Sequence, residues 1–307
     1  MTLRQAVLSD AENLNRLWRT VYPRRFWIET DLLADHTLLH PLFLPSASYV
    51  ATEGERITAF CLVKKNGYGL YPGPVPDDAH LSAVAFRNPA AASECLKMAR
   101  SALGDFKQLR FGQDSGHLWP GAPTTCSLLT QWLASEGFDF GGGIFDCEQD
   151  LADYTPPPGP PAIRVGLLRP PEIPKLDDFF LREFPGRWRY DVMAKVAANG
   201  PSCVVVLRDG SKIEGFALIQ DETTGPQIGG AVWNLALGKN WCSLGPIGIS
   251  KHLRGAKRGD ALLAAALMEL KGRGRRNCII DWTTLKKFYG GHGFRSSRQY
   301  LSASLHL

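Results

Sequence analysis

Apolar positions along the chain follow two spacings, and the resulting elements occur in the same order twice. Apolar residues three and four positions apart predict helices, and short apolar runs bounded by Gly, Pro or Asp predict strands. In the first half we predict helices over 10–21, 89–103 and 127–135, and strands over 48–51, 57–63, 79–86, 107–111 and 144–151. In the second half we predict helices over 174–183 and from about 261, and strands over 203–207, 213–220, 243–250 and 277–281.

A proline-rich segment separates the two halves. Residues 155–162 read TPPPGPPA, which excludes a helix and favours a stiff, extended spacer. Matching positions on its two sides, such as Arg4 and Arg164, are about 160 residues apart. The sequence therefore predicts a duplicated α/β fold, with domains over 1–154 and 163–307 joined by this linker.

Composition narrows the class of protein. The 307 residues carry a net charge of +5, which is too mild to predict nucleic-acid binding over the whole surface. The chain has no apolar run long enough for a membrane span, and its N-terminal residues lack the apolar core of a signal peptide. Seven scattered cysteines without a CxxC pair predict reduced thiols in a cytoplasmic protein and no zinc site. We expect a monomer, with the two copies forming an internal pseudo-dimer.

Residues 254–259, Arg-Gly-Ala-Lys-Arg-Gly, form a basic turn between an apolar strand and a helix. Backbone N–H groups at the start of a helix lack partners, and the helix dipole is positive there, so the turn is a candidate anion site. Between Lys251 and Lys287, ten Lys and Arg residues outnumber three Asp and Glu residues. A solvated helix face or a nucleic-acid patch would not explain why this charge flanks a glycine turn. Pro246, inside the preceding apolar run, predicts a bulge or an edge.

The turn resembles the acyl-CoA loop of the GCN5-related N-acetyltransferases (GNATs), whose pattern is Gln/Arg-x-x-Gly-x-Gly/Ala. Arg254 and Gly259 fit its first and last positions, and Lys257 stands where the middle Gly is usual. Residues 288–294, FYGGHGF, are similar to the family's Tyr-x-x-x-Gly-Phe segment. The resemblance implies two tandem GNAT folds, each with a mixed, mostly antiparallel sheet flanked by helices. Tandem enzymes that acetylate amino sugars such as glucosamine are the most similar type.

The resemblance also implies roles for individual residues. Acetyl-CoA would be the co-substrate, and no metal is expected. Tyr289 would be the general acid that protonates the departing thiolate. The backbone of 247–250 would pair with the pantetheine amides and offer an N–H group to the thioester carbonyl. The residues expected to bind CoA are Ile247, Gly248, Ile249, Arg254, Gly255, Ala256, Lys257, Arg258, Gly259, Asp260 and Ala261.

Asp281, at the end of the last predicted strand, has two interpretations. Its carboxylate could take a proton from the incoming ammonium, or it could cap the helix that follows. Arg187, Trp188 and Tyr190 are expected in a loop within the family's acceptor-specificity region, although we favour a purely structural turn there. The lone histidines, His252 and His292, are expected in exposed loops and are assigned no role.

The two copies are unequal. After the strand over 79–86 the first copy has the turn RNPAAASE, which contains no glycine and almost no positive charge. Leu133 stands there where Tyr289 stands in the second copy. We therefore expect one working site, in the second domain.

The predicted function is transfer of an acetyl group from acetyl-CoA to a small primary amine, by direct attack in a ternary complex. An amino sugar is the acceptor that the resemblance favours. Two alternatives remain open: a module that binds acyl-CoA without turnover, and an N-acyltransferase acting on a protein amine or an aminoacyl-tRNA.

Overall fold

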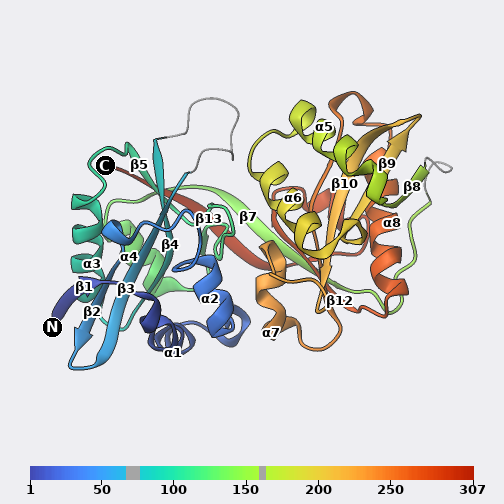
Figure 1. Cartoon of the computed structure of the whole chain (residues 1–307). Helices are drawn as coiled ribbons and strands as arrows, with labels where there is room; N and C mark the ends of the chain where they lie inside the picture. The colour runs from blue at the N-terminus through green and yellow to red at the C-terminus, as the bar shows by residue number, and fades with distance from the viewer. Residues whose placement is uncertain (67–76, 159–163) are drawn as a thin grey trace. The chain divides into compact units, whose positions relative to one another are not determined.

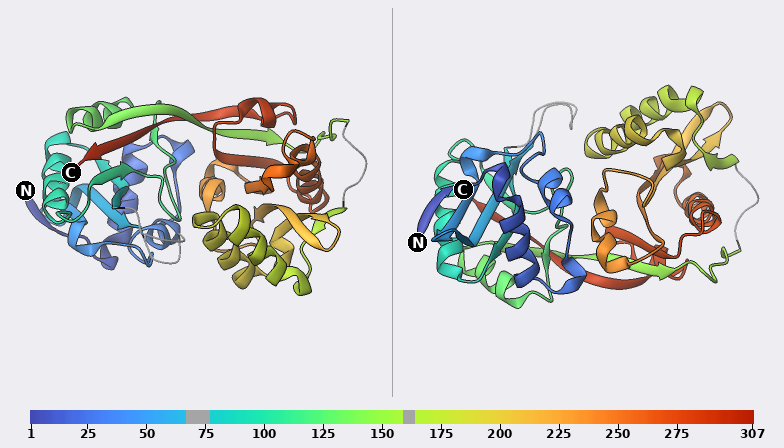
Figure 2. Two further views of the ribbon diagram at one scale, coloured as in Figure 1. Left: turned by 90° about the horizontal axis from the view of Figure 1, so that it is seen from above. Right: turned by 60° about the horizontal axis from the view of Figure 1, so that its bottom comes forward.

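The computed structural model describes residues 1–66, 77–158 and 164–307. Its contacts divide the chain into two compact units, and both chain termini belong to unit 1 (Figure 2). Of the described residues, unit 1 comprises 1–66, 77–144 and 298–307, and unit 2 comprises 145–158 and 164–297. Within the predicted linker, residues 155–158 form neither helix nor strand, and 159–162 lie outside the described residues, as does Ile163.

Unit 1 is an α/β unit built on one mixed sheet. Its strand order is β1(Thr2–Gln5), β2(Tyr49–Glu53), β3(Arg56–Lys65), β4(Asp78–Phe86), β5(Gln108–Phe111) and β13(Arg295–His306), and the short β6(Ala122–Pro123) also pairs with β13. Neighbouring strands are antiparallel except β4 and β5, which are parallel. The helices are α1(Ala11–Val21), α2(Thr30–His36), α3(Pro89–Ser101) and α4(Ser127–Ser135).

Unit 2 repeats this plan. Its strand order is β8(Arg164–Leu167), β9(Val204–Asp209), β10(Lys212–Asp221), β11(Trp241–Ile249), β12(Asn277–Thr283) and β7(Asp139–Asp150), with only β11 and β12 parallel. The helices are α5(Ile173–Glu183), α6(Arg187–Asn199), α7(Asn234–Leu237), α8(Arg258–Gly272) and α9(Lys286–Gly290) (Figure 1). The predicted α/β duplication with mixed, mostly antiparallel sheets is confirmed. None of the described helices is long and apolar enough to cross a membrane.

Each sheet is completed by a strand from the other half of the sequence. Residues 304–306 of β13 pair with 108–110 of β5 in unit 1. Residues 145–150 of β7 pair along β12 in unit 2. The two units therefore do not follow the predicted domain bounds, because 145–154 lie in unit 2 and 298–307 lie in unit 1.

Two apolar cores cover the two faces of the sheet in unit 2. Along β9, Val205 and Leu207 enter the core beneath α8, whereas Val204 and Val206 enter the core beneath α5 and α6. This alternation is the period-2 pattern of a strand buried on both faces. The residues that predicted the amphipathic helix are all buried in α8: Leu262, Leu263, Ala266, Leu267 and Leu270.

Strand β11 is irregular at its centre. The register between β10 and β11 shifts around Gly245 and Pro246, so the bulge that Pro246 predicted is confirmed. β11 pairs with β12 only along 241–243, although β11 continues to Ile249. Among the described strands, the remaining part of β11 pairs only with β10, so backbone groups on its other edge are available to a ligand.

Unit 1 buries an ion pair between Lys64 and Asp114, whose side chains are 1% and 2% exposed. Burial acts to raise the pKa of Asp114, but the charges of Lys64 and His80 outweigh it and hold that pKa well below its usual range. Because the folded pKa lies below the unfolded value of about 4, the stabilisation is present above that pH and is lost as the pH falls further.

We expect Asp114→Ala to lower the free energy of unfolding by about 3–5 kcal/mol at pH 7, because it leaves the Lys64 charge buried without its carboxylate. Urea unfolding monitored by circular dichroism measures the change. Asp77, which pairs with Lys107 on the surface, supplies the control: Asp77→Ala is expected to change stability little. Equal effects of the two substitutions would contradict a stabilising role for the buried ion pair between Lys64 and Asp114.

Candidate functional site

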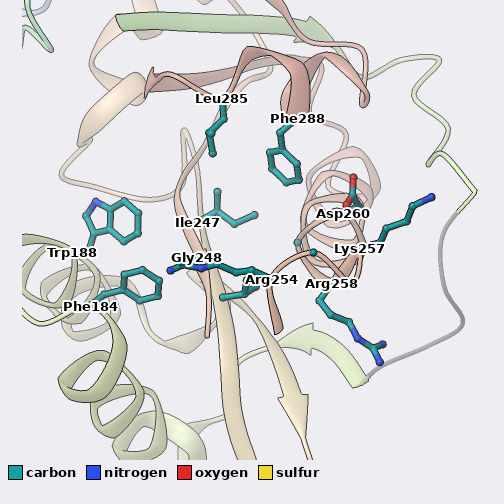
Figure 3. A pocket seen from close by; sticks show the side chains of 13 residues that line it. Phe184, Trp188, Ile247, Gly248, Arg254, Lys257, Arg258, Asp260, Leu285 and Phe288 are labelled. Carbon is teal, nitrogen blue, oxygen red and sulfur yellow. The ribbon is translucent and has the colours of Figure 1, made fainter. Parts of the chain in front are cut away.

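One cavity of unit 2, of about 580 Å³, gathers most of the residues predicted to bind CoA. The turn before α8 and the first turn of α8 form one end, Phe184 and Trp188 form the other, and β11 lies between them (Figure 3). Nine of the eleven predicted residues line this cavity: Ile247, Gly248, Ile249, Arg254, Gly255, Lys257, Arg258, Gly259 and Asp260. Ala256 and Ala261 are not among its lining residues.

The turn takes the conformation that its sequence pattern requires. Gly255 has a φ of 84°, and Lys257, where the family pattern usually has glycine, takes the left-handed conformation at φ 55° and ψ 20°. Lys257 is also the N-cap residue of α8, and its side chain makes no capping hydrogen bond. The start of this 15-residue helix therefore presents N–H groups and the positive end of its dipole to the cavity.

The basic stretch divides into a neutralised part and a free part. Beyond α8, Arg273 pairs with Glu269, Arg275 with Asp221 and Glu222, and Arg276 with Asp150. Within the described chain, the residues of the turn that carry positive charge form no ion pair: Arg254, Lys257 and Arg258. Lys251, Lys271, Lys286 and Lys287 form no ion pair with the described residues either, so the carboxylates neutralise three of the ten basic residues and leave the turn positively charged.

Aromatic residues close the other end of the cavity. A Cβ atom on Gly248 would lie 2.7 Å from Cζ of Phe184, so only glycine permits this approach. The rings of Phe184 and Trp188 have centroids 5.0 Å apart. Arg187, Trp188 and Tyr190 were predicted in a loop, but they form the first turn of α6 after Gly186, which has a φ of 117°. Three further residues line the cavity and were not predicted to do so: Phe184, Leu285 and Phe288.

Tyr289 lies in α9, behind the cavity wall. It is buried, its ring packs against Phe288 with centroids 4.9 Å apart, and it does not line the cavity itself. Burial, and next the charge of Asp281, raise the pKa of Tyr289 far above its ordinary value. The phenol is therefore protonated throughout the physiological pH range.

Asp281 lies within β12, beyond the point where β12 pairs with β11. The N-cap residue of α9 is Leu285, and its N–H group donates to Oγ1 of Thr283 at 2.9 Å. The interpretation of Asp281 as a helix cap is therefore wrong. The Asp281 carboxylate lies beside Gly229 and Gly245, where added Cβ atoms would be 3.0 Å and 3.7 Å from its Oδ1, and Asp281 is not among the residues that line the cavity.

His292 is buried, contrary to the prediction of an exposed loop, whereas His252 is exposed as predicted. Nδ1 of His292 lies 2.9 Å from the Tyr154 hydroxyl, and Nε2 lies 3.4 Å from Oδ1 of Asp260. Burial is the main influence on the pKa of His292 and lowers it, although Asp260 opposes this effect. His292 therefore joins the first turn of α8 to the segment that follows α9.

The corresponding turn in unit 1 is built differently. α3 begins after Asn88, whose Oδ1 accepts the N–H group of Ala90 at 3.0 Å. The start of this helix is thus satisfied by its own side chain. Leu133, at the position expected to match Tyr289, is buried in α4.

No family model and no curated protein matches the sequence, but solved structures do. A GCN5-related glucosamine N-acetyltransferase region of a fungal multi-domain GH3 β-N-acetylglucosaminidase matches with a TM-score of 0.82 and 17% identity, over 99% of this chain and 38% of that one. A GCN5-related N-acetyltransferase from Sphaerobacter thermophilus matches with a TM-score of 0.70 and 14% identity, over 99% and 95% of the two chains. A tandem GNAT protein from the clavulanic acid biosynthesis pathway matches with a TM-score of 0.65 and 15% identity, over 99% of this chain and 98% of that one.

At these identities the matches establish the fold. The chain has two tandem GNAT folds, and the predicted resemblance is confirmed at that level. The chain spans 38% of the length of the fungal chain that it matches. The reaction and the substrates must be argued from the cavity itself.

Proposed function

We propose that the chain is an N-acetyltransferase that moves an acetyl group from acetyl-CoA to a small primary amine, using the cavity of unit 2. The observation that carries the proposal is the junction, in one cavity, of an uncapped, positively charged helix start with the part of β11 that pairs with β10 but not with β12. The tandem GNAT fold supports it, because both features lie where members of this fold bind acyl-CoA.

The phosphates of the donor suit the end of the cavity formed by the turn. N–H groups at the start of α8 would hold the pyrophosphate, and the side chains of Arg254, Lys257 and Arg258 would add positive charge. The pantetheine arm would lie along 247–249, where β11 has no β12 partner. Its amides could then pair with backbone groups as an added strand would.

Tyr289 and Asp281 suit the proton transfers of the reaction. As the amine nitrogen attacks the thioester carbonyl carbon and the C–S bond breaks, the ammonium proton would pass to Asp281 and the departing thiolate would receive a proton from Tyr289. The raised pKa of Tyr289 keeps that proton in place until sulfur becomes basic. Phe288, which packs against Tyr289, lines the cavity, but Tyr289 and Asp281 do not. Proton transfer would therefore require a movement of α9 or a bridging water.

Release of CoA from acetyl-CoA in the presence of an amine panel tests the proposal. Amino sugars are the first acceptors to test, since the fungal region that matches with the highest TM-score quoted above is described as a glucosamine N-acetyltransferase. We expect thiol release that depends on the amine. Tight binding of acetyl-CoA without release by any amine would favour the regulatory module, and no binding would reject the proposal.

Dependence on salt separates small amines from aminoacyl-tRNA. Binding of a polyanion releases counterions, so a tRNA acceptor would lose affinity steeply between about 50 and 200 mM salt. We expect the KM for a small amine to change little over the same range.

Phe184 is expected to limit the length of the acyl group. It closes the end of the cavity opposite the turn, so Phe184→Ala should raise kcat/KM for butyryl-CoA roughly 10- to 200-fold relative to acetyl-CoA. Leu181→Ala, on the exposed side of α5, is the control and should leave the ratio unchanged. An unaltered ratio in Phe184→Ala would show that the acyl group lies elsewhere.

A further inference from the structure

Unit 1 contains a cavity of its own, of about 410 Å³, which the proposed reaction does not use. Three separate elements each bring an arginine to it: Arg16 comes from α1, Arg56 begins β3, and Arg87 follows β4. We refer to it as the arginine cavity. It is a concave site lined by three cationic groups, in the copy that lacks the glycine turn.

The arginines of this cavity lack internal counter-charges. Within the described chain, none of the three guanidinium groups forms an ion pair or a side-chain hydrogen bond. Elsewhere in unit 1, Arg4, Arg19 and Arg110 each lie 2.6–3.2 Å from a carboxylate. Glu55 is the one acidic residue among those that line the cavity, and it is exposed. Three like charges that converge on a concave surface repel one another, and a bound anion would relieve that repulsion.

In unit 2, the other copy of the fold, the positions equivalent to Arg87 and Thr58 are occupied by Ser250 and Glu214. In unit 2 the N–H group of Ser250 donates to the carbonyl oxygen of Glu214 at 2.9 Å, and in unit 1 the N–H group of Arg87 donates in the same way to Thr58 at 3.1 Å. The Glu214 carboxylate accepts a hydrogen bond from Ser250 and lies 3.8 Å from Arg182. Unit 1 therefore has a neutral hydroxyl in place of that carboxylate and a guanidinium in place of the serine.

Unit 2 has two carboxylates beside Arg182 at this position, whereas three arginines and one carboxylate line the cavity of unit 1. Ligand atoms of Glu183, Glu214 and His252 lie within 4.8 Å of one another, so two carboxylates are close to Arg182 there. The cavity of unit 1 therefore has three arginines and one carboxylate, Glu55, which leaves it with a net positive charge to offer an anion.

We propose that the arginine cavity binds a small organic phosphate. The planar guanidinium group matches two phosphate oxygens at once, and a phosphate monoester carries nearly two negative charges at pH 7. A volume of about 410 Å³ exceeds what inorganic phosphate fills and lies within the range of small-ligand sites. The site would be independent of the acetyl-CoA cavity and would give the first copy of the fold, unit 1, a binding function.

Isothermal titration calorimetry tests the inference. The full chain is titrated with a hexose 6-phosphate and, separately, with inorganic phosphate, at constant ionic strength. We expect one saturable site that binds the hexose phosphate more tightly than inorganic phosphate. Arg56→Gln and Arg87→Gln should each weaken binding about tenfold, since each removes one charge-assisted contact. Both side chains are exposed, so the variants should fold normally, as their melting temperatures without ligand would verify.

Two control variants locate the binding. Arg100→Gln removes an exposed arginine of α3 outside the cavity and should leave the affinity unchanged. Lys257→Gln alters the turn of unit 2 and should also leave it unchanged. Loss of binding in Lys257→Gln alone would place the phosphate on the acetyl-CoA turn and overturn the inference. Equal affinity in all variants, no saturable binding, or tighter binding of inorganic phosphate than of the hexose phosphate would overturn it as well.

Discussion

Replacing Tyr289 with phenylalanine is expected to lower kcat about a hundredfold and to leave the Kd for acetyl-CoA nearly unchanged. A positioned general acid contributes roughly 10²–10⁴-fold to a rate, and the phenol hydroxyl is the only atom that this change removes. Tyr289 does not line the cavity, so the donor should bind as before. The substitution also keeps the buried ring against Phe288, which preserves the packing of α9.

Steady-state kinetics with the best amine of the panel, together with calorimetric titration of acetyl-CoA, separate the two effects. Tyr190→Phe is the matched control, because it removes the same hydroxyl from an exposed residue of α6. Unchanged kcat in Tyr289→Phe would remove the acid assignment. Because burial and Asp281 raise the pKa of Tyr289, wild-type kcat should not fall between pH 8 and 10 through loss of this proton.

The elements whose residues have a local pattern were predicted closely from the sequence. The helix over 127–135 matches α4, and the leucines that predicted α8 are its buried face. Pro246 predicted the bulge because a proline cannot donate to a ladder, whatever the rest of the sheet does. These predictions depend on the nearest few residues, which the sequence gives directly.

The exchange of strands could not be predicted in this way. A strand was predicted over 144–151, which overlaps β7, but none was predicted over 295–306, where β13 forms. Neither sequence specifies the strand with which it pairs, because the partner depends on the packing of the whole sheet. The predicted domain bounds at 154 and 163 follow the proline-rich segment, whereas the units follow the sheets.

Residues whose burial depends on distant partners were also predicted poorly. In α6, Lys195 is buried and donates to the carbonyl oxygen of Pro226 at 2.8 Å. Because a charged residue occupies a buried position, the sequence of α6 shows no clear apolar face. His292 is buried between Tyr154 and Asp260, which are far from it in the chain. A polar residue of this kind looks exposed until its hydrogen-bond partners are known.

The residues of the candidate site also differ in how well they could be predicted from the sequence. The turn and β11 form a continuous segment, and its residues were found from their order alone. Phe184 comes from the end of α5, and Leu285 and Phe288 come from the region of α9, so only the fold brings them to the cavity. Phe184 had a signal in the segment FPGRW, but the similar YPRRF in the first copy favoured a structural turn.

Gly259→Val is expected to raise the Kd for CoA about a hundredfold or more, equivalent to roughly 3 kcal/mol. A Cβ atom at Gly259 would lie 3.6 Å from Cε2 of Phe288 and 4.0 Å from Cδ1 of Ile249, both ordinary contacts. The helix therefore accepts a side chain here without backbone strain. The two methyl groups of valine would occupy the cavity beside the start of α8, where phosphate oxygens must approach the backbone N–H groups.

Titration calorimetry with CoA measures the effect, and Gly272→Val supplies the matched control. Gly272 ends the same helix, lines no part of the cavity, and has open space where a Cβ atom would stand. Both variants carry the same cost of a β-branched residue in α8, so only the difference between them reports on the cavity. Gly259→Ala should weaken binding less than valine, because its single methyl group fills less space. Equal CoA affinity in Gly259→Val and Gly272→Val would mean that the phosphates do not bind at the start of α8.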